Sequence, residues 1–240
     1  MINTQHNIKY ITNPYKIWII DNFMITEVIN KINQEWLEND AKQWHSGRAM
    51  VGGKTNILEH KMLSISTITN MPSYIATICK QLHSDQMTQL VSNITKIKGL
   101  ITDHTMRWSG MRVMTKGSHQ LIHSDARKHP DNGLRKEITC LLYLNKDYNR
   151  SSHEGCLEIW NDDVSQCIHK IEPLNNRLIM FQNSDTSYHG VPVVKKDRKA
   201  ILFSIMKDSN CSNREFAEFV ARPQDPESVA IIGKERGKGQ

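Results

Sequence analysis

Apolar residues recur at helical spacing in the N-terminal part of the chain. An apolar, β-branched segment at residues 16–23 predicts a strand, and after it Thr26 is a candidate helix N-cap with Glu27 in the first turn. One face of this predicted helix carries six apolar residues: Ile25, Val28, Ile29, Ile32, Trp36 and Leu37. Residues 44–55 are typical of a loop, and a second helical stretch is predicted at 72–98 with a break near Ser84.

From Arg107 onward the apolar pattern changes to a period of two, which predicts strands. At residues 138–144 both alternating faces are apolar, as in a strand covered on both sides. Further strands are predicted at residues 108–114, 156–160, 177–182, 188–194 and 200–206. Helices followed by a run of short strands predict a mainly β fold, a sandwich or barrel with the N-terminal helices packed on one sheet.

The same pattern sets the expected domain organisation. We predict one domain over residues 1–221, with a helical part at about 1–106 and a β core at about 107–207. Residues 222–240 are rich in proline, glycine and charged residues, so we expect a largely disordered tail.

The composition is that of a soluble globular protein, with 38% hydrophobic and 23% charged residues. Its apolar runs are far shorter than a membrane span, and its first residues show no secretory signal, so we expect a cytoplasmic protein without membrane contact. The five cysteines include no CxxC pair and are expected to be reduced core residues: Cys79, Cys140, Cys156, Cys167 and Cys211.

The chain carries a net charge of +6, with basic clusters at residues 195–199 and 234–238. This charge is compatible with an acidic partner, including nucleic acid, but most runs of charge are solvated surface, and that interpretation is favoured. Charge alone identifies no ligand.

A histidine and an aspartate separated by one residue occur twice, as His83 with Asp85 and as His123 with Asp125. On an extended segment such residues point the same way, and an Fe(II) site that activates O2 needs two imidazoles and one carboxylate on one face of the metal. The first pair falls in a helical stretch, where residues two apart diverge, and is interpreted as a surface coincidence. The second lies at a strand end before the β-rich half and is the candidate site.

His189 is the candidate third ligand of this ion. Arg198 lies nine residues later, at the start of a predicted strand, where its guanidinium can hold a carboxylate in a bidentate fork. The distal carboxylate of 2-oxoglutarate fits such a group. Alternation places Ala200, Leu202 and Ser204 on the Arg198 face. The opposite face is expected to pack against the helices: Ile201, Phe203 and Ile205.

From about residue 112 to residue 206 the chain resembles the 2-oxoglutarate- and Fe(II)-dependent dioxygenases of the prolyl 4-hydroxylase type, with closest likeness to the hypoxia-sensing prolyl hydroxylases. The segments that carry the resemblance follow the family's order and spacing: 138–148 (ITCLLYLNKDY), 155–160 (GCLEIW), 171–173 (IEP), 176–181 (NRLIMF) and 189–191 (HGV).

The resemblance implies a double-stranded β-helix, or jelly roll, packed on helices. It implies Fe(II) on His123, Asp125 and His189, the tail of 2-oxoglutarate on Arg198 and Tyr143, O2 as the other co-substrate, and it allows for ascorbate. The implied reaction hydroxylates a C–H bond of a prolyl residue in a protein or peptide. Two positions depart from the family: Val113 stands where a tyrosine is usual, ten residues before His123, and Leu202 replaces a hydroxyl residue.

Other polar and aromatic residues have structural alternatives. Tyr143 is also compatible with an ordinary core tyrosine, and Trp160 either lines the substrate entrance or packs in the core. Arg177 is expected to form a structural salt bridge. Four histidines are interpreted as loop residues rather than ligands: His104, His119, His129 and His153.

Three other functions remain open. One is the hydroxylation of a free amino acid or another small metabolite. Another is nucleic-acid demethylation, although such enzymes place their arginines farther beyond the distal histidine than Arg198. The third is a non-catalytic, metal-binding β-sandwich. The loops at residues 128–134 and 150–154 are expected to select the substrate, and the sequence names neither that substrate nor the oligomeric state.

Overall fold

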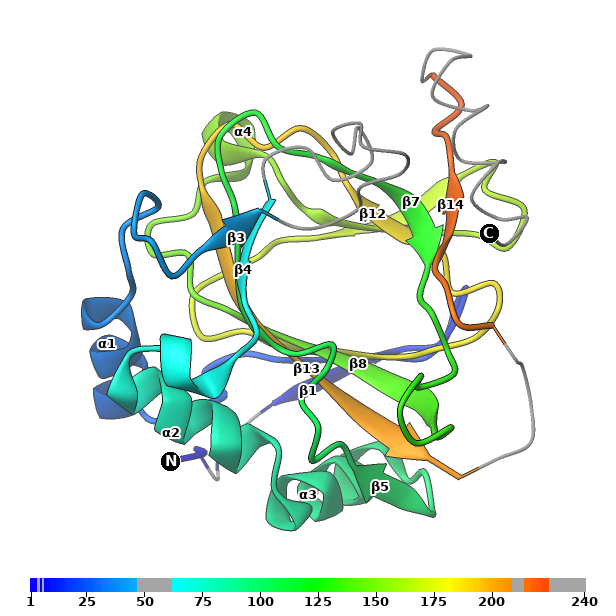
Figure 1. The fold of residues 1–240 in the computed structure, drawn as a ribbon. Helices are drawn as coiled ribbons and strands as arrows, with labels where there is room; N and C mark the ends of the chain where they lie inside the picture. The colour runs from blue at the N-terminus through cyan, green and yellow to red at the C-terminus, as the bar shows by residue number, and fades with distance from the viewer. Residues whose placement is uncertain (4, 6, 47–61, 209–213, 225–240) are drawn as a thin grey trace.

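The computed structural model describes residues 1–3, 5, 7–46, 62–208 and 214–224. In this part of the chain two antiparallel β-sheets face each other, and helices lie along the outside of the larger sheet (Figure 1). This arrangement confirms the predicted mainly β fold, a jelly roll packed on helices.

The larger sheet has nine strands among the described residues. Eight of them follow one another in the order β1 (Ile8–Ile11), β2 (Ile17–Ile20), β11 (Leu178–Gln182), β8 (Arg135–Tyr143), β13 (Arg198–Lys207), β6 (Gly110–Met114), β4 (Met62–Ile65) and β3 (His45–Ser46). The ninth, β5 (Leu100–Thr102), pairs with the end of β13. The smaller sheet runs in the order β10 (Cys167–Ile171), β9 (Leu157–Trp160), β12 (His189–Val191), β7 (Gln120–Ser124) and β14 (Glu218–Val220).

Three helices, α1 (Thr26–Gln34), α2 (Ser73–Leu82) and α3 (Asp85–Thr95), pack on the outer face of the larger sheet, with the 3-10 helix η2 (Ile68–Asn70) before α2. Alternate residues of the central strands form the core against these helices, among them Cys140 of β8 and Phe203 of β13. Phe203 is fully buried, and burial of a side chain of this size stabilises the fold by about 1.5–3 kcal/mol. The outer face of the sheet therefore supplies the main core.

The residues in between point toward the smaller sheet. Tyr143 of β8 and Ala200 of β13 lie in a second cluster together with Leu157 and Ile159 of β9. Since the period of a strand is two, each central strand contributes to the core on one face and to the space between the sheets on the other.

The helices follow the predictions closely. α1 begins at Thr26 as expected, although its N-cap is Ile25, which offers no side-chain cap, and Trp36 lies beyond its end while still packing in the same core. The predicted break falls between α2 and α3, where the Ser84 hydroxyl caps α3 by accepting a hydrogen bond from the Met87 amide (3.2 Å).

The N-terminal part is less helical than predicted. It contributes strands β1 to β4 to the larger sheet, and β2 lies between β1 and β11 within that sheet. Residues 45–46, expected in a loop, form the short strand β3, while residues 47–55 of that predicted loop lie outside the described residues. Of these strands only β2 was predicted, because all four of its residues are apolar, whereas β1, β3 and β4 are short and of mixed polarity.

Two strands of the smaller sheet, β10 and β14, were also not predicted, whereas β7 ends beside His123 and Asp125 as expected. The predicted tail begins too early, because Arg222 is buried and hydrogen-bonded, while residues 225–240 lie outside the described part. A single domain ending near residue 221 remains a prediction.

Two expectations from composition can be compared with the structure. None of the described helices has the length and apolar character needed to cross a membrane. Cys79, Cys140 and Cys156 are buried free thiols and Cys167 is a half-buried one, whereas Cys211 lies outside the described residues.

Candidate active site

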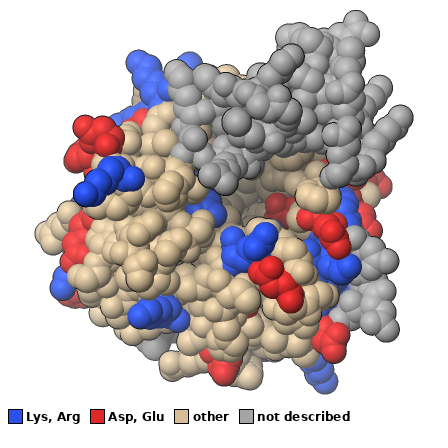
Figure 2. All heavy atoms as spheres, in the orientation of Figure 1, with Lys and Arg blue, Asp and Glu red and all other residues tan. Residues whose placement is uncertain are grey.

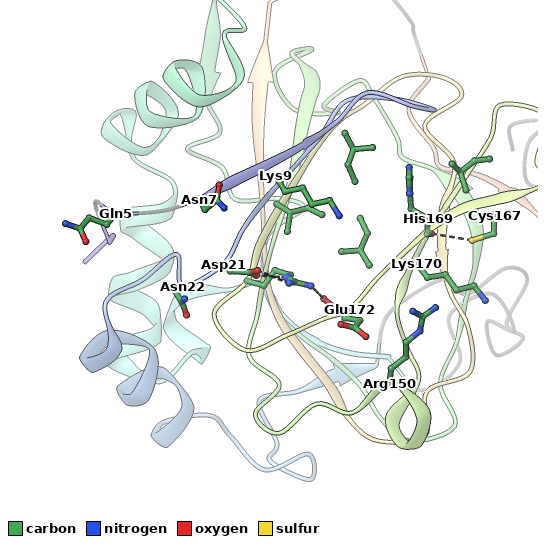
Figure 3. A pocket seen from close by; sticks show the side chains of 15 residues that line it. Gln5, Asn7, Lys9, Asp21, Asn22, Arg150, Cys167, His169, Lys170 and Glu172 are labelled. Carbon is green, nitrogen blue, oxygen red and sulfur yellow. Dashed lines mark hydrogen bonds and ion pairs between the residues drawn. The ribbon is translucent and has the colours of Figure 1, made fainter.

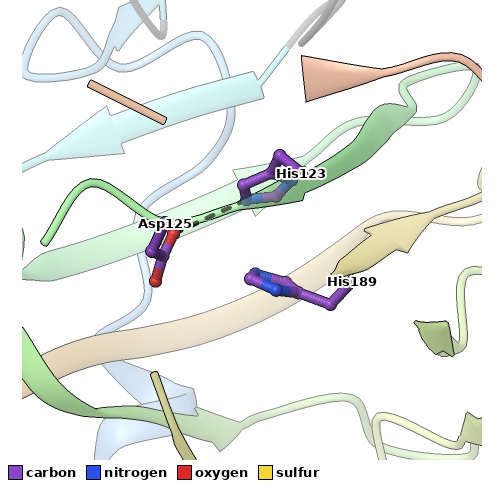
Figure 4. Close-up of side chains that lie close together, drawn as sticks. All are labelled: His123, Asp125 and His189. Atoms are coloured by element: carbon purple, nitrogen blue, oxygen red, sulfur yellow. Dashed lines mark ion pairs between the residues drawn. The ribbon is translucent and has the colours of Figure 1, made fainter. Parts of the chain in front are cut away.

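His123, Asp125 and His189 come together at the centre of the smaller sheet. β7 and β12 are antiparallel neighbours, and their register places His189 opposite His123, while Asp125 follows the last residue of β7. One potential ligand atom from each side chain lies within 4.8 Å of the other two. Figure 4 shows the three side chains pointing toward one another. This is the predicted trio.

Both imidazoles are oriented by the backbone. Nδ1 of His123 lies 3.0 Å from the Leu121 carbonyl oxygen, and Nδ1 of His189 lies 3.0 Å from that of Ser187. Because a carbonyl can only accept, each Nδ1 carries the proton, and Nε2 keeps the lone pair that a metal ion requires.

The carboxylate of Asp125 is held by groups of the larger sheet. Its Oδ2 accepts hydrogen bonds from the Thr139 hydroxyl (2.7 Å) and the Lys136 ammonium (3.3 Å), and its Oδ1 lies 3.6 Å from Nε2 of His123. Asn183 in turn donates to the Thr139 hydroxyl (3.0 Å). These contacts fix the carboxylate while leaving Oδ1 on the side of the histidines.

The protonation states suit a metal site. Burial alone would raise the pKa of Asp125, but the charge of Lys136, the charges that His189 and His123 carry when protonated, and the Thr139 hydrogen bond outweigh it and hold that pKa well below its usual value. Burial lowers the pKa of His189, although Asp125 opposes this effect. An ionised carboxylate and neutral imidazoles are the forms that coordinate a divalent ion. Two imidazoles and one carboxylate on one side fit the facial arrangement of non-haem Fe(II) sites.

Arg198 and Tyr143 form a second polar group between the sheets. The Arg198 side chain is buried and donates hydrogen bonds to the Gly155 carbonyl (2.9 Å), the Met114 sulfur (3.6 Å) and the Tyr143 hydroxyl (2.6 Å). None of these three partners is negatively charged. Since a buried guanidinium without a counter-charge is costly, the lack of an ion pair to Arg198 among the described residues favours an anionic ligand.

Tyr143 can add a hydrogen bond to such a ligand. It is fully buried, and burial raises its pKa although Arg198 opposes the shift, so the phenol keeps its proton. Since its oxygen accepts from Arg198, its hydrogen is available for a carboxylate. Both predicted co-substrate residues therefore lie together.

Position 155, just before β9, requires a glycine for structural reasons. Gly155 has a φ of +76°, and a Cβ at this position would lie 2.7 Å from a methyl carbon of Val194. A larger residue would therefore disturb the carbonyl that holds Arg198.

The trio and Arg198 line one cavity of about 350 Å³ between the sheets. Figure 2 shows a hollow in this face of the molecule, with basic and acidic side chains side by side at its rim. Ala200 and Leu202 line the cavity, while Ile201 and Phe203 belong to the core against the helices, as alternation predicted. Val113 also packs in that core, and its neighbours Arg112 and Met114 line the cavity in its place.

Residues 214–222, which we name the C-terminal strap, complete the site, and the sequence analysis did not identify them. In β14 the register sets Phe219 opposite His123, and the two rings stack with centroids 5.2 Å apart. Arg214 donates to the Asp125 carbonyl (2.8 Å) and the Ser124 hydroxyl (2.6 Å). The strap therefore supports the strand that carries His123, and Phe219 also lines the cavity.

The end of the strap is anchored by a buried ion pair. Arg222 donates to the Glu158 carboxylate (3.0 Å) and to the Gln120 carbonyl (2.9 Å), and so joins β14 to β9 and β7. A three-residue strand gives no periodic signal, so only the charge of Arg222 could have drawn attention to this segment.

The remaining candidates lie apart from the trio. His83 is buried and bonded to the Cys79 carbonyl (2.8 Å), so it is not the surface residue that was predicted, but its neighbour Asp85 is exposed and the pair forms no site. His129 is a loop residue as expected, fully buried and bonded to the Thr105 hydroxyl (2.8 Å). Trp160 packs in a small core cluster.

A larger cavity, of about 840 Å³, lies between the sheet edges formed by β1 and β10 (Figure 3). Its polar lining includes Arg177, which forms the predicted structural salt bridge with Asp21 (2.5 and 2.8 Å). None of the candidate iron or co-substrate residues lines this cavity, so its size does not make it the site of the chemistry.

The model of the 2OG-Fe(II) oxygenase superfamily matches residues 109–206, the stretch that contains the trio together with Tyr143 and Arg198. Residues 109–206 are thus similar in sequence to the 2OG-Fe(II) oxygenase superfamily. Fe(II), 2-oxoglutarate and O2 are the cofactor and co-substrates of this superfamily. Comparison with curated protein sequences gave no match.

Several solved structures share the fold of this chain. A prolyl-4-hydroxylase from Pseudomonas putida has a TM-score of 0.58 at 15% identity, covering 80% of this chain and 93% of its own. A prolyl hydroxylase from Trichoplax adhaerens, solved with a hypoxia inducible factor peptide fragment, has a TM-score of 0.58 at 16% identity, covering 80% and 83%. A prolyl 4-hydroxylase from Phytophthora capsici has a TM-score of 0.50 at 15% identity, covering 92% and 68%.

The hydroxyl of Thr139 is expected to strengthen metal binding through Asp125. Replacing Thr139 with valine keeps the shape but removes the hydrogen bond, so Fe(II) affinity should fall by about tenfold to a hundredfold, as measured by anaerobic calorimetry. Thr186→Val, in an exposed turn, is the matched control and should bind iron as the wild type does. Equal affinities for wild type and T139V would show that Thr139 does not support the carboxylate.

The ring of Phe219 is expected to position His123. Phe219→Ala removes a buried ring and should lower the free energy of unfolding by about 3 kcal/mol and weaken Fe(II) binding. Phe219→Leu keeps most of the burial but loses the stacked ring, so iron affinity should fall more than stability. The control Phe216→Ala changes a ring that is 61% exposed and should alter neither quantity. If F219L bound iron normally, the strap would have only a structural role.

Proposed function

We propose that this chain is an Fe(II)- and 2-oxoglutarate-dependent dioxygenase that hydroxylates a prolyl residue in a protein or peptide. The observation that carries the proposal is the single cavity lined both by His123, Asp125 and His189 and by Arg198. The prolyl hydroxylase structures that share the fold support the choice of substrate.

In this proposal the trio holds Fe(II), and Arg198 and Tyr143 hold the distal carboxylate of 2-oxoglutarate. When bound, iron and 2-oxoglutarate supply the oxidation, in which O2 and 2-oxoglutarate are consumed, CO2 and succinate are released, and a substrate C–H becomes C–OH. Ascorbate dependence and a cytoplasmic location belong to the same proposal.

In this proposal the protein's own residues bind and orient 2-oxoglutarate and shield the reacting groups from water. Arg198 is held at its Nε by the Gly155 carbonyl, so its terminal nitrogens are directed toward the ligand and Tyr143. Part of the cavity wall is apolar and is formed by Leu141, Leu157 and Ala200. This wall limits the water around the reacting groups. Lys136 balances the charge of Asp125 at 3.3 Å.

Two alternatives make different predictions for the substrate. A hydroxylase of free amino acids would consume 2-oxoglutarate with free proline and not with peptides. A non-catalytic metal-binding domain would release no succinate with either, yet the buried Arg198, which forms no ion pair among the described residues, argues against it.

The proposal is tested by succinate release and by the gain of one oxygen atom in a library of proline-containing peptides, with free proline in parallel. Arg198→Gln should raise the KM for 2-oxoglutarate by about tenfold to a hundredfold, because it loses a charge-assisted hydrogen-bonding pair. Arg150→Gln removes an exposed arginine and should leave this KM unchanged. Turnover with free proline alone, or an unchanged KM in R198Q, would contradict the proposal.

A further inference from the structure

Lys136 is a buried cation beside the candidate metal ligands. It belongs to β8, is only 5% exposed, and lines the same cavity as the trio. Its ammonium lies 3.3 Å from Oδ2 of Asp125. Lysine is almost never fully buried unless it is paired, so this position in the cavity wall indicates a specific electrostatic role.

The ammonium of Lys136 is held in place by an aromatic ring as well as by the carboxylate. Nζ lies over the ring of Trp108, 4.3 Å from its centroid, where a cation is attracted by the π electrons. The edge of that indole packs against the ring of His129, with centroids 5.1 Å apart, and His129 is bonded to the Thr105 hydroxyl (2.8 Å). The charge of Lys136 is therefore fixed beside Asp125.

Lys136 and Thr139 act on the same oxygen of Asp125 but differ in charge. The Thr139 hydroxyl lies 2.7 Å from Oδ2, closer than the ammonium at 3.3 Å, so the hydroxyl already orients the carboxylate. What Lys136 adds is a full positive charge. In a cavity between two sheets such a charge repels a divalent cation and attracts a dianion more strongly than it would in water.

We infer that Lys136 sets the balance of charge at the metal site, weakening the binding of Fe(II) and strengthening the binding of 2-oxoglutarate. The inference rests on the proposed function. With neutral imidazoles, the charges of Asp125 and Lys136 cancel before either ligand binds. An uncharged residue at position 136 would leave one negative charge in the cavity wall, which favours the metal ion and disfavours the co-substrate.

The test is Lys136→Met, which keeps an apolar stem beside Trp108 and removes the charge. The Fe(II) affinity, measured by anaerobic calorimetry, should rise at least about tenfold. The affinity of the iron-loaded protein for 2-oxoglutarate, measured by titrating the metal-to-ligand charge-transfer band, should fall about tenfold. These shifts have opposite signs, whereas a merely loosened site would bind both ligands more weakly.

Three further variants separate charge from structure. Lys136→Arg keeps the charge and can stack on Trp108, so both affinities should stay within about threefold of the wild type. Lys80→Met removes a lysine from the exposed side of α2 and should change neither affinity. Trp108→Leu keeps the lysine but frees its ammonium, so both affinities should shift in the same directions as in K136M, by a smaller factor.

Thermal unfolding shows whether K136M is folded, and W108L decides the matter if it is not. An unchanged or lower Fe(II) affinity in folded K136M, or K136R binding both ligands as K136M does, would overturn the inference while the hydroxylase function stands. If K136M did not fold, unchanged affinities in W108L would overturn it. A wild-type protein that bound neither Fe(II) nor 2-oxoglutarate would overturn the proposed function as well.

Discussion

The pairing of β7 with β12 is the constraint on which the rest of the site depends. It sets His189 directly opposite His123, although the two residues are far apart in sequence, and Asp125 follows at the end of the same strand. Both histidine rings are then fixed by carbonyls of their own strands or turns. β14 holds β7 from the other side, with Phe219 against His123. The three candidate metal ligands are thus positioned by backbone pairing more than by contacts among themselves.

In the larger sheet, the alternation of residues along each strand links the stability of the fold to the position of the cavity-lining residues. Along β13 the residues Arg198 and Ala200 face the cavity, while Ile201 and Phe203 pack against the helices. A slip of one residue would move the whole apolar set into the cavity and the arginine into the core, so burial of the helix-facing side fixes the register of the binding residues. The same alternation affects the charge of the cavity, because Arg112 and Arg198, which both line it, lie on adjacent strands of one face.

The sequence predicted those parts of the site that have a local pattern. His123, Asp125, His189, Tyr143 and Arg198 lie in or beside strands with clear alternation, and the structure places them in one cavity or in contact with one of its lining residues. Val113 shows the limit of spacing alone, because counting ten residues back from His123 reaches a residue on the helix-facing side. The strap and the strands β1, β3 and β4 could not be predicted, because they are short and owe their structure to tertiary pairing. Arg222 was predicted to lie in a disordered tail because its burial depends on an ion pair with Glu158, which is distant in the sequence.

The central claim is that His123, Asp125 and His189 hold an iron ion to which 2-oxoglutarate binds. The most direct measurement is the anaerobic addition of Fe(II) and 2-oxoglutarate to the purified protein, followed by visible absorption spectroscopy. The structure predicts the weak metal-to-ligand charge-transfer band of the iron chelate in the wild type and its loss in His189→Ala. A wild-type protein that binds iron without the band, or a folded H189A variant that keeps it, would contradict the claim.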